Sequence, residues 1–449
     1  MENKSKHIII LGAGESGIGA AILAQQKKYD VFVSDSGAIK ESYKKELVGY
    51  QIPFEEKHHD IEKILKADEI VKSPGISEKT EIMKRIRKSG IPVISEIELA
   101  YRYAGNSKII AITGSNGKST TTALTYHIFH QAGLNAACVG NIGKSFARQV
   151  ALSPADYYIV EVSSFQLDDI NQFKPDVAVL LNITPDHLDR YEYKMENYAK
   201  AKFRIIENQT EENYFVYCKD DPETKKYFNR QPINSKTLPF TIMETLHEGA
   251  FMEGENMHIK IDEEDMSLSI YELALKGKHN WYNSMAAGIS ARVMQIRKGS
   301  IRESMKTFTG LKHRLEFVAT VRGVDFINDS KATNVNSVWF ALEGMLRPVV
   351  LILGGVDKGN DYSFIQELIK EKVKAIVCLG TDNHFIQEAF SKEVPTMVNT
   401  SNMKDAVHAA YMFSSPGDVV LLSPACASFY LFTNYEDRGN QFKECVRDL

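Results

Sequence analysis

The chain has 449 residues, of which 25% are charged and 43% are apolar, and its formal net charge is −4. This length predicts about three domains, and the charge gives no electrostatic reason to expect nucleic acid as a partner. No apolar run is long enough for a signal peptide or a membrane span, so we expect no membrane insertion. Five widely spaced cysteines without a Cys-x-x-Cys pair argue against a disulfide framework and favour a cytoplasmic location.

Short apolar strands alternate with helical stretches along most of the chain, a pattern typical of parallel sheets with crossover helices. The first segment begins with a strand at His7–Leu11, a turn at Gly12–Gly17 and a helix around residues 18–28. The turn matches G-x-G-x-x-G, and Asp35 follows the next strand at Val31–Ser34. These residues fit either a dinucleotide or the diphosphate of a nucleotide-sugar. Further strands are predicted at Glu69–Lys72 and Val93–Ser95, and the segment closes near residue 97.

The second segment opens with the most informative stretch of the chain. A strand at Ile109–Thr113 leads into a glycine turn at Gly114–Gly117 and then into a predicted helix that begins with Lys118 and Ser119. The spacing departs from the standard G-x-x-x-x-G-K-[ST], because the loop starts only at Gly114. The order still suits a phosphate, since glycines let backbone N–H groups surround its oxygens at a helix N-terminus. Lys118 would then reach the terminal phosphates, and Ser119 would offer a hydroxyl to Mg²⁺.

Two further strands, Tyr157–Val162 and Val177–Leu181, end in polar residues. Glu161 is a carboxylate in an apolar strand beside the phosphate loop, which favours a Mg²⁺ ligand over a structural role. His187 and two carboxylates follow the second of these strands, within Asn182–Asp189. The location of His187 leaves a ligand role and a structural role equally open.

The rest of the second segment is less regular. Lys200 and Lys202 lie on a predicted helix at Met195–Glu207 and point to different faces, so at most one of them enters a site. Residues 211–276 are acidic and alternate in short runs, which predicts antiparallel strands appended to the central sheet. A helix at Asn283–Met294 follows, in which the Asn283 amide either recognises adenine or caps the helix.

The third segment begins near Leu311, after a predicted hinge at Gly310. After its last strand, Ser428 either binds a carboxylate at a helix N-terminus or caps that helix. Cys426 has no flanking histidine, which argues against a nucleophilic role. The strands of this segment are predicted at Val324–Asn328, Val349–Leu353, Ala375–Leu379 and Val419–Ser423.

Taken together, these blocks resemble the Mur ligase family of peptidoglycan synthesis over essentially the whole chain. The chain has Ser-Pro-Ala-Cys-Ala-Ser at residues 423–428, as the D-glutamate-adding members do, and lacks the Asp-Asn-Pro-Arg stretch typical of the diaminopimelate- and lysine-adding members. The motifs that carry the resemblance are Gly114–Thr120, Glu161–Leu167, Asn182–Arg190, His279–Asn283, His313-Arg314, Asp329–Asn334 and Ser423–Ser428.

The resemblance implies an α/β fold of three domains, each built on a mainly parallel sheet. These are a Rossmann-like UDP-sugar-binding domain at residues 1–97, a P-loop ATPase-like domain at 98–310 with a small antiparallel sheet, and a Rossmann-like D-glutamate-binding domain at 311–449. The implied reaction is ATP-dependent amide formation between UDP-N-acetylmuramoyl-L-alanine and D-glutamate through an acyl phosphate, giving ADP and phosphate. It also implies two Mg²⁺ ions, ATP as co-substrate and a cytoplasmic enzyme, which we expect to be a monomer.

The family's site residues carry over to matching positions of this chain. For ATP they are Gly114, Ser115, Asn116, Gly117, Lys118, Ser119, Thr120, Asn283, Arg314 and Asp329. For the UDP-sugar they are Gly14, Glu15, Ser16, Asp35, Ser36, Gly75, Asn141 and His187, and for D-glutamate they are Lys331, Thr333, Lys358, Ser428 and Tyr435. The metal positions are Ser119, Glu161, His187 and Lys202, and the catalytic ones are Lys118, His187 and Lys202, of which family members carbamylate the last.

Two positions depart from the family pattern. Tyr435 stands where many members have Phe, and Tyr430 stands where Asp is expected.

Other interpretations of the sequence remain beside a D-glutamate-adding ligase. Another Mur-type amino-acid ligase is the nearest, and an NAD-dependent oxidoreductase would rest on Gly12–Gly17 and Asp35. A folylpolyglutamate synthase would not need the first segment, and a non-catalytic nucleotide-binding module would leave Glu161 unexplained.

Overall fold

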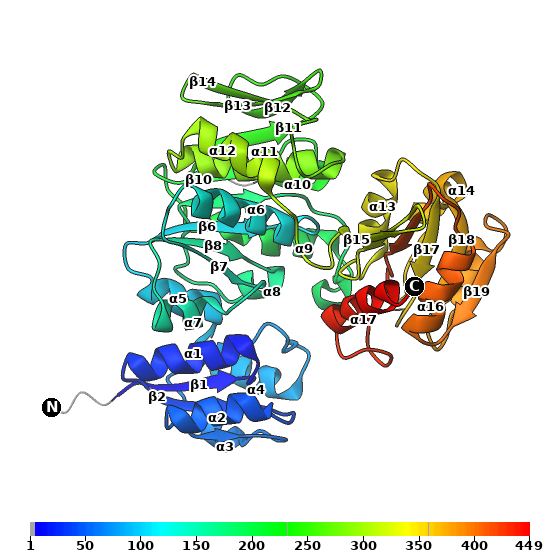
Figure 1. Ribbon diagram of the computed structural model, residues 1–449. Helices are drawn as coiled ribbons and strands as arrows, with labels where there is room; N and C mark the ends of the chain where they lie inside the picture. Colours follow the sequence, from blue (N-terminus) through cyan, green and yellow to red (C-terminus); the bar gives the residue numbers. More distant parts are fainter. Residues whose placement is uncertain (1–4, 231, 358) are drawn as a thin grey trace. The chain divides into compact units, whose positions relative to one another are not determined.

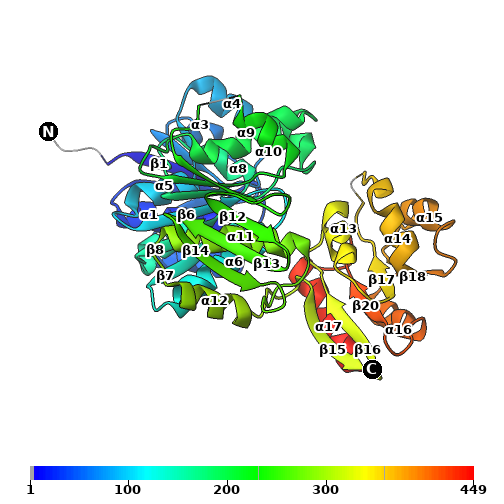
Figure 2. The same cartoon turned by 90° about the horizontal axis from the view of Figure 1, so that it is seen from above.

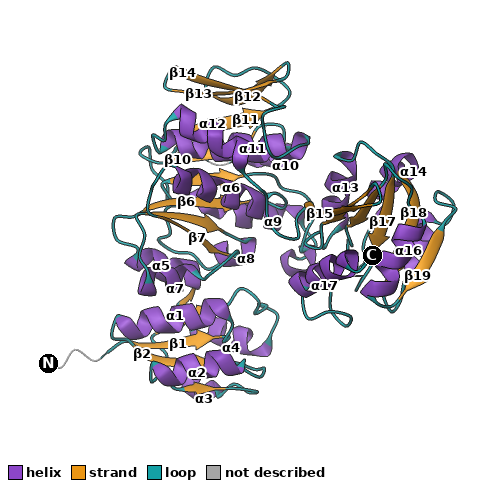
Figure 3. Cartoon of the chain, in the orientation of Figure 1, coloured by secondary structure: helices purple, strands orange, loops and turns teal. Residues whose placement is uncertain are grey.

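The computed structural model describes residues 5–230, 232–357 and 359–449, which form three β-sheets in chain order (Figure 1). The chain divides into two compact units. Met1–Leu273 with Trp281–Phe308 contains the first and second sheets, and Ala274–Asn280 with Thr309–Leu449 contains the third. Helices and strands alternate along the chain (Figure 3), and the predicted α/β class with mainly parallel sheets is confirmed. None of the helices in the described residues has the length and apolar character that crossing a membrane requires.

The first sheet is fully parallel, with strand order β3-β2-β1-β4-β5. Its strands are β1 (His7–Leu11), β2 (Asp30–Ser34), β3 (Phe54–Glu55), β4 (Glu69–Lys72) and β5 (Val93–Ser95). Successive side chains enter opposite cores, because strand side chains alternate between faces. Ile8 and Ile10 pack with α1 (Glu15–Gln26) and α2 (Glu41–Gly49), whereas Ile9 and Leu11 pack with α3 (Ile61–Ile64) and α4 (Glu81–Ser89).

The central sheet has nine strands in the order β14-β13-β12-β11-β10-β9-β6-β8-β7. Figure 2 shows α8, α9 and α10 on one side of it and α6, α11 and α12 on the other. The strands are β6 (Lys108–Thr113), β7 (Ala136–Gly140), β8 (Tyr157–Glu161), β9 (Val177–Leu180), β10 (Tyr214–Cys218), β11 (Lys236–Thr241), β12 (Gly249–Glu253), β13 (Asn256–Ile261) and β14 (Glu264–Ser269). The helices are α5 (Glu96–Tyr103), α6 (Lys118–Gln131), α7 (Phe146–Leu152), α8 (Ser164–Leu167), η1 (Leu188–Tyr191), α9 (Met195–Phe203), η2 (Arg204–Ile206), α10 (Pro222–Phe228), α11 (Lys278–Val293) and α12 (Lys298–Thr307).

The antiparallel part of the central sheet is smaller than residues 211–276 suggested. β10 pairs in parallel with β9 and β11, and β11 pairs in parallel with β12. The antiparallel pairings are the two that β13 makes, with β12 and with β14. The helix α10 lies between β10 and β11, and this crossover lets the chain return in the same direction and extend the parallel sheet.

The third sheet is parallel except for one edge strand, in the order β15-β16-β20-β17-β18-β19. Two cores cover its two faces, one with α13, α14 and α15 and the other with α16 and α17. Its strands are β15 (Glu316–Val321), β16 (Val324–Asn328), β17 (Val349–Leu353), β18 (Val373–Leu379), β19 (Met397–Thr400) and β20 (Val419–Leu422). Its helices are α13 (Val335–Glu343), η3 (Tyr362–Ile365), α14 (Gln366–Lys372), α15 (His384–Phe390), α16 (Met403–Met412) and α17 (Tyr435–Arg447).

A buried carboxylate in α5 anchors the connection between the first and second sheets. Glu98 is 0% exposed, and its Oε2 accepts hydrogen bonds from the backbone N–H groups of Asn171, Gln172 and Phe173 at 2.9–3.0 Å. Its Oε1 accepts a hydrogen bond from Arg102. A buried charge needs such partners, because an unsatisfied one is costly.

We therefore expect Glu98→Gln to lower the stability of the protein. The amide would turn two N–H donors toward groups that are themselves donors, at a cost of about 2–3 kcal/mol. The thermal unfolding midpoint, followed by circular dichroism, should fall by about 4–8 °C. The same change at the exposed Glu62 is the control and should leave the midpoint unchanged. Equal midpoints for the two variants would show that Glu98 does not stabilise this connection.

Candidate active site

The phosphate-type loop joins β6 to α6 as the sequence predicts. Gly117 precedes α6 with φ 85°, and Gly114 has φ 154°. A Cβ added at Gly117 would lie 2.4 Å from Asn283 Oδ1, so only glycine fits there. Lys118 folds back over the loop and donates hydrogen bonds from Nζ to the carbonyls of Gly114 (2.8 Å) and Ser115 (2.9 Å).

The loop is held against the end of the neighbouring strand β9. The Asn182 side chain pairs with the backbone of Asn116, accepting from its N–H (2.9 Å) and donating to its carbonyl (3.1 Å). Ser115 Oγ donates to the Thr184 carbonyl (2.9 Å), and the Thr184 N–H donates back to Ser115 Oγ (2.9 Å). These four hydrogen bonds hold residues 115 and 116 in place, and none of them uses a backbone N–H group of the first turn of α6.

Lys202 is the lysine of α9 that enters this site, whereas Lys200 is exposed, as the different faces of the helix predict. Lys202 is 1% exposed, and its Nζ donates to the Gly114 carbonyl at 2.7 Å. Burial, reinforced by the Lys118 ammonium, lowers the pKa of Lys202 well below its usual range. Burial therefore favours the neutral, nucleophilic form of its amine.

Glu161 ends β8 next to the loop, because Ile112 of β6 pairs with Glu161 in the parallel register. Its Oε1 accepts a hydrogen bond from Asn141 Nδ2 at 2.8 Å. Its Oε2 is buried and has no hydrogen-bond partner among the described residues. An orphaned, buried carboxylate oxygen is costly alone and suits a hard cation such as Mg²⁺.

His187 follows β9, which pairs with β6 on the side opposite β8, the strand of Glu161. It has φ 52°, its ring packs 5.2 Å from that of Phe165, and its Nε2 is 3.7 Å from Asp186 Oδ1. Its side chain is 55% exposed. Within the described parts of the chain, no three His, Cys, Asp or Glu side chains gather into a group able to hold a metal ion.

Asn283 does not cap a helix, so one of its two predicted roles is wrong. Helix α11 begins five residues earlier, at Lys278, because the His279–Asn283 stretch is itself helical. The Asn283 Oδ1 instead accepts a hydrogen bond from Thr121 Oγ1 of α6 at 3.1 Å. This bond ties α11 to the first turn of the phosphate-loop helix.

The second glycine loop joins β1 to α1. Asp35 supports it from the end of β2, where Oδ2 accepts a hydrogen bond from the Ala13 N–H at 2.6 Å. Gly14 precedes α1, and Glu15 forms an ion pair with Arg148 at 2.8 Å. Ser36 is exposed beside Asp35, and the Gly75 carbonyl accepts from Arg190 at 2.8 Å.

In the third sheet, the predicted residues cluster at the carboxyl ends of β16 and β20. Asp329 is buried, accepts hydrogen bonds from the Leu315 N–H (3.2 Å) and Ser423 Oγ (2.9 Å), and burial raises its pKa to about 6 although Arg314 opposes that rise. The Lys331 ammonium lies 5.6 Å from the centre of the Tyr435 ring.

Three further residues that the sequence predicted for the third sheet's unit are Ser428, Thr333 and Lys358. Ser428 is buried, but it neither caps a helix nor lies at a helix N-terminus, because α17 begins at Tyr435 and is capped by Asn434. Thr333 is exposed, and Lys358 lies outside the described residues.

Several polar residues near these sites escaped the sequence analysis. Arg438 is 1% exposed within α17, and Arg148 links Glu15 to Glu46. Glu96 is buried in α5, and burial raises its pKa to about 7. The sequence indicates a buried Glu96 only by placing it, like Glu98, among the apolar residues of Val93–Leu99.

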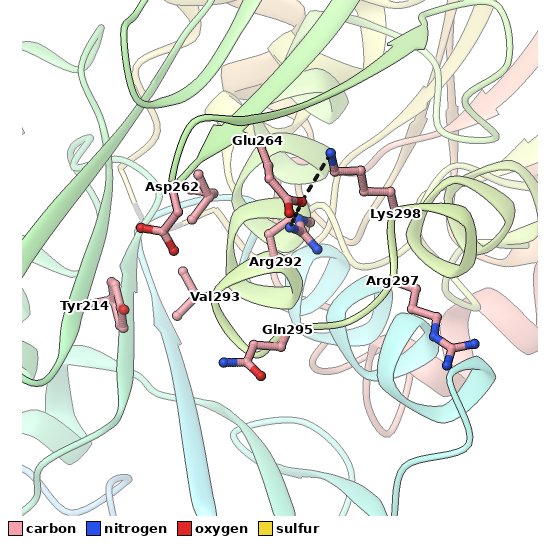
Figure 4. Close-up of a pocket in the computed structure, with 9 residues that line it drawn as sticks. Tyr214, Asp262, Glu264, Arg292, Val293, Gln295, Arg297 and Lys298 are labelled. Atoms are coloured by element: carbon pink, nitrogen blue, oxygen red, sulfur yellow. Dashed lines mark hydrogen bonds and ion pairs between the residues drawn. The ribbon is translucent and has the colours of Figure 1, made fainter.

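A cavity of about 650 Å³ lies elsewhere in the central unit (Figure 4). Tyr214, the first residue of β10, lines it, so it is at the amino ends of the parallel strands, opposite the phosphate loop. Its cations Arg292 and Lys298 both form ion pairs with Glu264, at 2.8 and 3.2 Å. Arg297 and Asp262 also line the cavity, so three cations face two carboxylates, and this near balance of charge gives no evident anion site.

The fold and the two glycine loops define an α/β nucleotide-binding protein with a P-loop-like central sheet and a Rossmann-like first sheet. Three family models match the chain in order. They are the Mur ligase MurD-like N-terminal domain at residues 6–95, the Mur ligase middle domain at 112–291 and the Mur ligase glutamate ligase domain at 313–426.

Whole-length relatives agree with these matches. The UDP-N-acetylmuramoylalanine–D-glutamate ligase of Bacteroides fragilis is 54% identical over 99% of this chain and 100% of its own, and that of Christiangramia forsetii is 52% identical with the same coverage. In fold, the chain is similar to the UDP-N-acetylmuramate–alanine ligase of Thermotoga maritima, with a TM-score of 0.64, 15% identity and coverage of 99% of both chains. The chain belongs to the Mur ligase family, and it is a ligase.

Gly117→Ala tests the loop. The added Cβ would meet Asn283 Oδ1 in a left-handed backbone, so we expect affinity for a non-hydrolysable ATP analogue, measured by calorimetry, to fall at least about tenfold. Gly133→Ala is the matched control, because Gly133 has a similar φ of 79° with open space around its Cβ position. Unchanged affinity in Gly117→Ala would remove the loop from the nucleotide site.

Proposed function

We propose that this protein joins D-glutamate to the L-alanine carboxylate of UDP-N-acetylmuramoyl-L-alanine, converting ATP to ADP and phosphate. Relatives more than 50% identical over their full length carry the name of this activity. The observation that carries the proposal is the convergence of Lys118 and Lys202 on the Gly114 carbonyl, beside a buried Glu161. In such a site the Lys118 ammonium can stabilise phosphate oxygens, and the buried Lys202 offers its amine for reaction.

In the first step, an oxygen of the L-alanine carboxylate bonds to the γ-phosphorus of ATP, the bond to the bridging oxygen breaks, and ADP leaves. Both partners are anions, and their repulsion at contact amounts to several kcal/mol without nearby cations. Lys118 begins the helix α6 and can turn from its loop carbonyls to the phosphate oxygens, where its charge opposes this repulsion.

The site residues fit Mg²⁺ through the orphaned Oε2 of Glu161. We propose that Ser119, Glu161, His187 and Lys202 hold two such ions. When bound, they supply positive charge to the phosphate oxygens. Asn141 positions the Glu161 carboxylate by donating to its other oxygen.

Lys202 needs a change of charge to act as a metal ligand. A neutral amine can attack carbon dioxide, forming an N–C bond and losing a proton, and the product is a carbamate with a carboxylate-like charge. The lowered pKa of Lys202 favours this reaction, because it increases the share of the amine that is unprotonated.

In the second step, the neutral amine of D-glutamate attacks the acyl phosphate carbon, the C–N bond forms and phosphate leaves. We propose that Lys331, Thr333, Lys358, Ser428 and Tyr435 bind this amino acid. His187 stays the candidate for taking the proton that the amine releases. We place ATP on the loop residues 114–120 and on Asn283, Arg314 and Asp329.

The remaining assignments also stay proposals. The UDP-sugar would lie on the first glycine loop, with Gly14, Glu15, Ser16, Asp35, Ser36, Gly75, Asn141 and His187. We propose domains at 1–97, 98–310 and 311–449, a monomeric cytoplasmic enzyme, and domain closure about Gly310, which has φ 80° and open space around its Cβ position.

The decisive experiment is ADP release from ATP with UDP-N-acetylmuramoyl-L-alanine and a panel of amino acids. Of the amino acids in the panel, we expect only D-glutamate to support ADP release. In Lys118→Ala the rate of ADP release should fall about 100-fold or more, because one preorganised charge at the transferring phosphate contributes that much. Turnover with L-alanine or a diamino acid instead would support another Mur-type ligase. Binding of a nicotinamide cofactor without ADP release would support an oxidoreductase.

Carbamylation of Lys202 is tested by chemical rescue. Lys202→Ala should lose nearly all activity, and short carboxylates such as acetate should restore part of it by replacing the carbamate. The exposed Lys200→Ala is the matched control on the same helix and should be active without added carboxylate. Full activity of Lys202→Ala without rescue would exclude Lys202 from the metal site.

A further inference from the structure

Three segments of the third sheet's unit carry four of the five residues proposed to bind D-glutamate, which are Lys331, Thr333, Ser428 and Tyr435. Residues 329–333 follow β16, residues 423–428 follow β20, and Tyr435 is the first residue of α17. They come from different parts of the chain, so a pocket between them needs something that sets their spacing.

Arg438 links the other two segments to its own helix, α17, which begins with Tyr435. From the first turn of α17, its Nε donates to Ser330 Oγ (3.0 Å) and its Nη2 to the Ser330 carbonyl (2.8 Å). Its Nη1 donates to the Cys426 carbonyl (3.1 Å). Ser330 Oγ in turn donates to the carbonyl of Tyr435 (2.8 Å).

The docking of α17 around Arg438 is close. A Cβ added at Gly439 would lie 2.1 Å from His313 Nδ1, so α17 approaches as near as a glycine permits. Asn328 Nδ2, at the end of β16, donates to the Gly439 carbonyl (3.2 Å). Arg438 therefore cannot shift without moving the helix or the strand end.

The charge of Arg438 is buried without an ion pair. Its side chain is among the largest that are fully buried, and all three of its hydrogen bonds go to neutral oxygens. It forms no ion pair with a carboxylate in the part of the chain that the structure describes, and burial lowers its pKa to about 10 although Asp329 opposes that change. A buried cation kept on neutral acceptors alone is expensive, and stability alone would favour an apolar residue.

We propose that Arg438 is a positioning residue for the amino-acid substrate. Its planar fork holds the Ser330 and Cys426 backbones at the spacing that lets their neighbours Lys331 and Ser428 bind one dicarboxylic amino acid. The proposal rests on the function proposed above. It adds a residue that does not touch the substrate but sets the affinity for it.

The test compares Arg438→Met, Arg438→Lys and Ser330→Ala with the wild type, and Arg447→Met is the matched control at the exposed end of the same helix. Steady-state KM values are measured for D-glutamate, ATP and the UDP-sugar. In addition, hydroxylamine traps the acyl phosphate as a hydroxamate in the absence of D-glutamate, which reports the first step alone.

We expect Arg438→Met to raise the KM for D-glutamate about tenfold or more. This rise corresponds to the loss of one or two charge-assisted hydrogen bonds. Arg438→Lys and Ser330→Ala should raise it less, because each keeps the charge and part of the contact. The KM values for ATP and UDP-sugar should change less than about twofold, hydroxamate formation should match the wild type, and Arg447→Met should behave as wild type.

An unchanged KM for D-glutamate in Arg438→Met overturns the proposal, and so does a parallel loss of hydroxamate formation, which would mark a general structural role. Circular dichroism checks folding. If Arg438→Met does not fold, Arg438→Lys and Ser330→Ala decide by the same KM comparison. Failure of the proposed function is seen separately, because the wild type would then show no D-glutamate-dependent ADP release.

Discussion

The site depends on two lysines that share one carbonyl. Lys118 and Lys202 both donate to the Gly114 carbonyl, from the loop side and from the buried side. Two like charges about 4 Å apart near a protein surface repel by about 4 kcal/mol, so both amines cannot stay charged cheaply. Lys202 is the buried partner, and desolvation lowers its pKa, which favours the neutral form there. Under the proposed function, Lys118 is the cation for a phosphate, and the buried Lys202 supplies the reactive amine.

Strand register brings the other groups to this carbonyl. Ile112 pairs with Glu161 on one side of β6, and Thr113 pairs with Leu180 on the other. The residues that follow these strands, including Asn182, therefore meet at one edge of the sheet, where parallel strands place ligands. The antiparallel β13 and β14 stand at the far end of the strand order and contribute nothing to that edge. They enlarge the core without changing the site.

The sequence predicted several parallel strands to the residue. β1, β4, β16 and β17 begin and end at the predicted residues, because a short run rich in apolar residues is followed there by a polar or glycine residue. It failed at β10 and β11, whose direction depends on the short crossover helix α10 rather than on their own pattern. It also failed at Ser428, since six residues of loop separate it from α17. Contacts such as those of Arg438 join distant segments and leave no local pattern.

The segment after β16 shows why such long-range contacts matter for a reaction with two steps. Its consecutive residues face different partners, since Asp329 accepts from Ser423 and Ser330 is held by Arg438. Asp329 is proposed for ATP, and Lys331 for the amino acid. The charges of Arg314 and Arg438 both act on the Asp329 carboxylate and oppose the rise in its pKa. A shift of this segment would change both the proposed nucleotide position and the proposed amino-acid position. Holding it in place therefore fixes the spacing between the phosphoryl donor and the incoming amine.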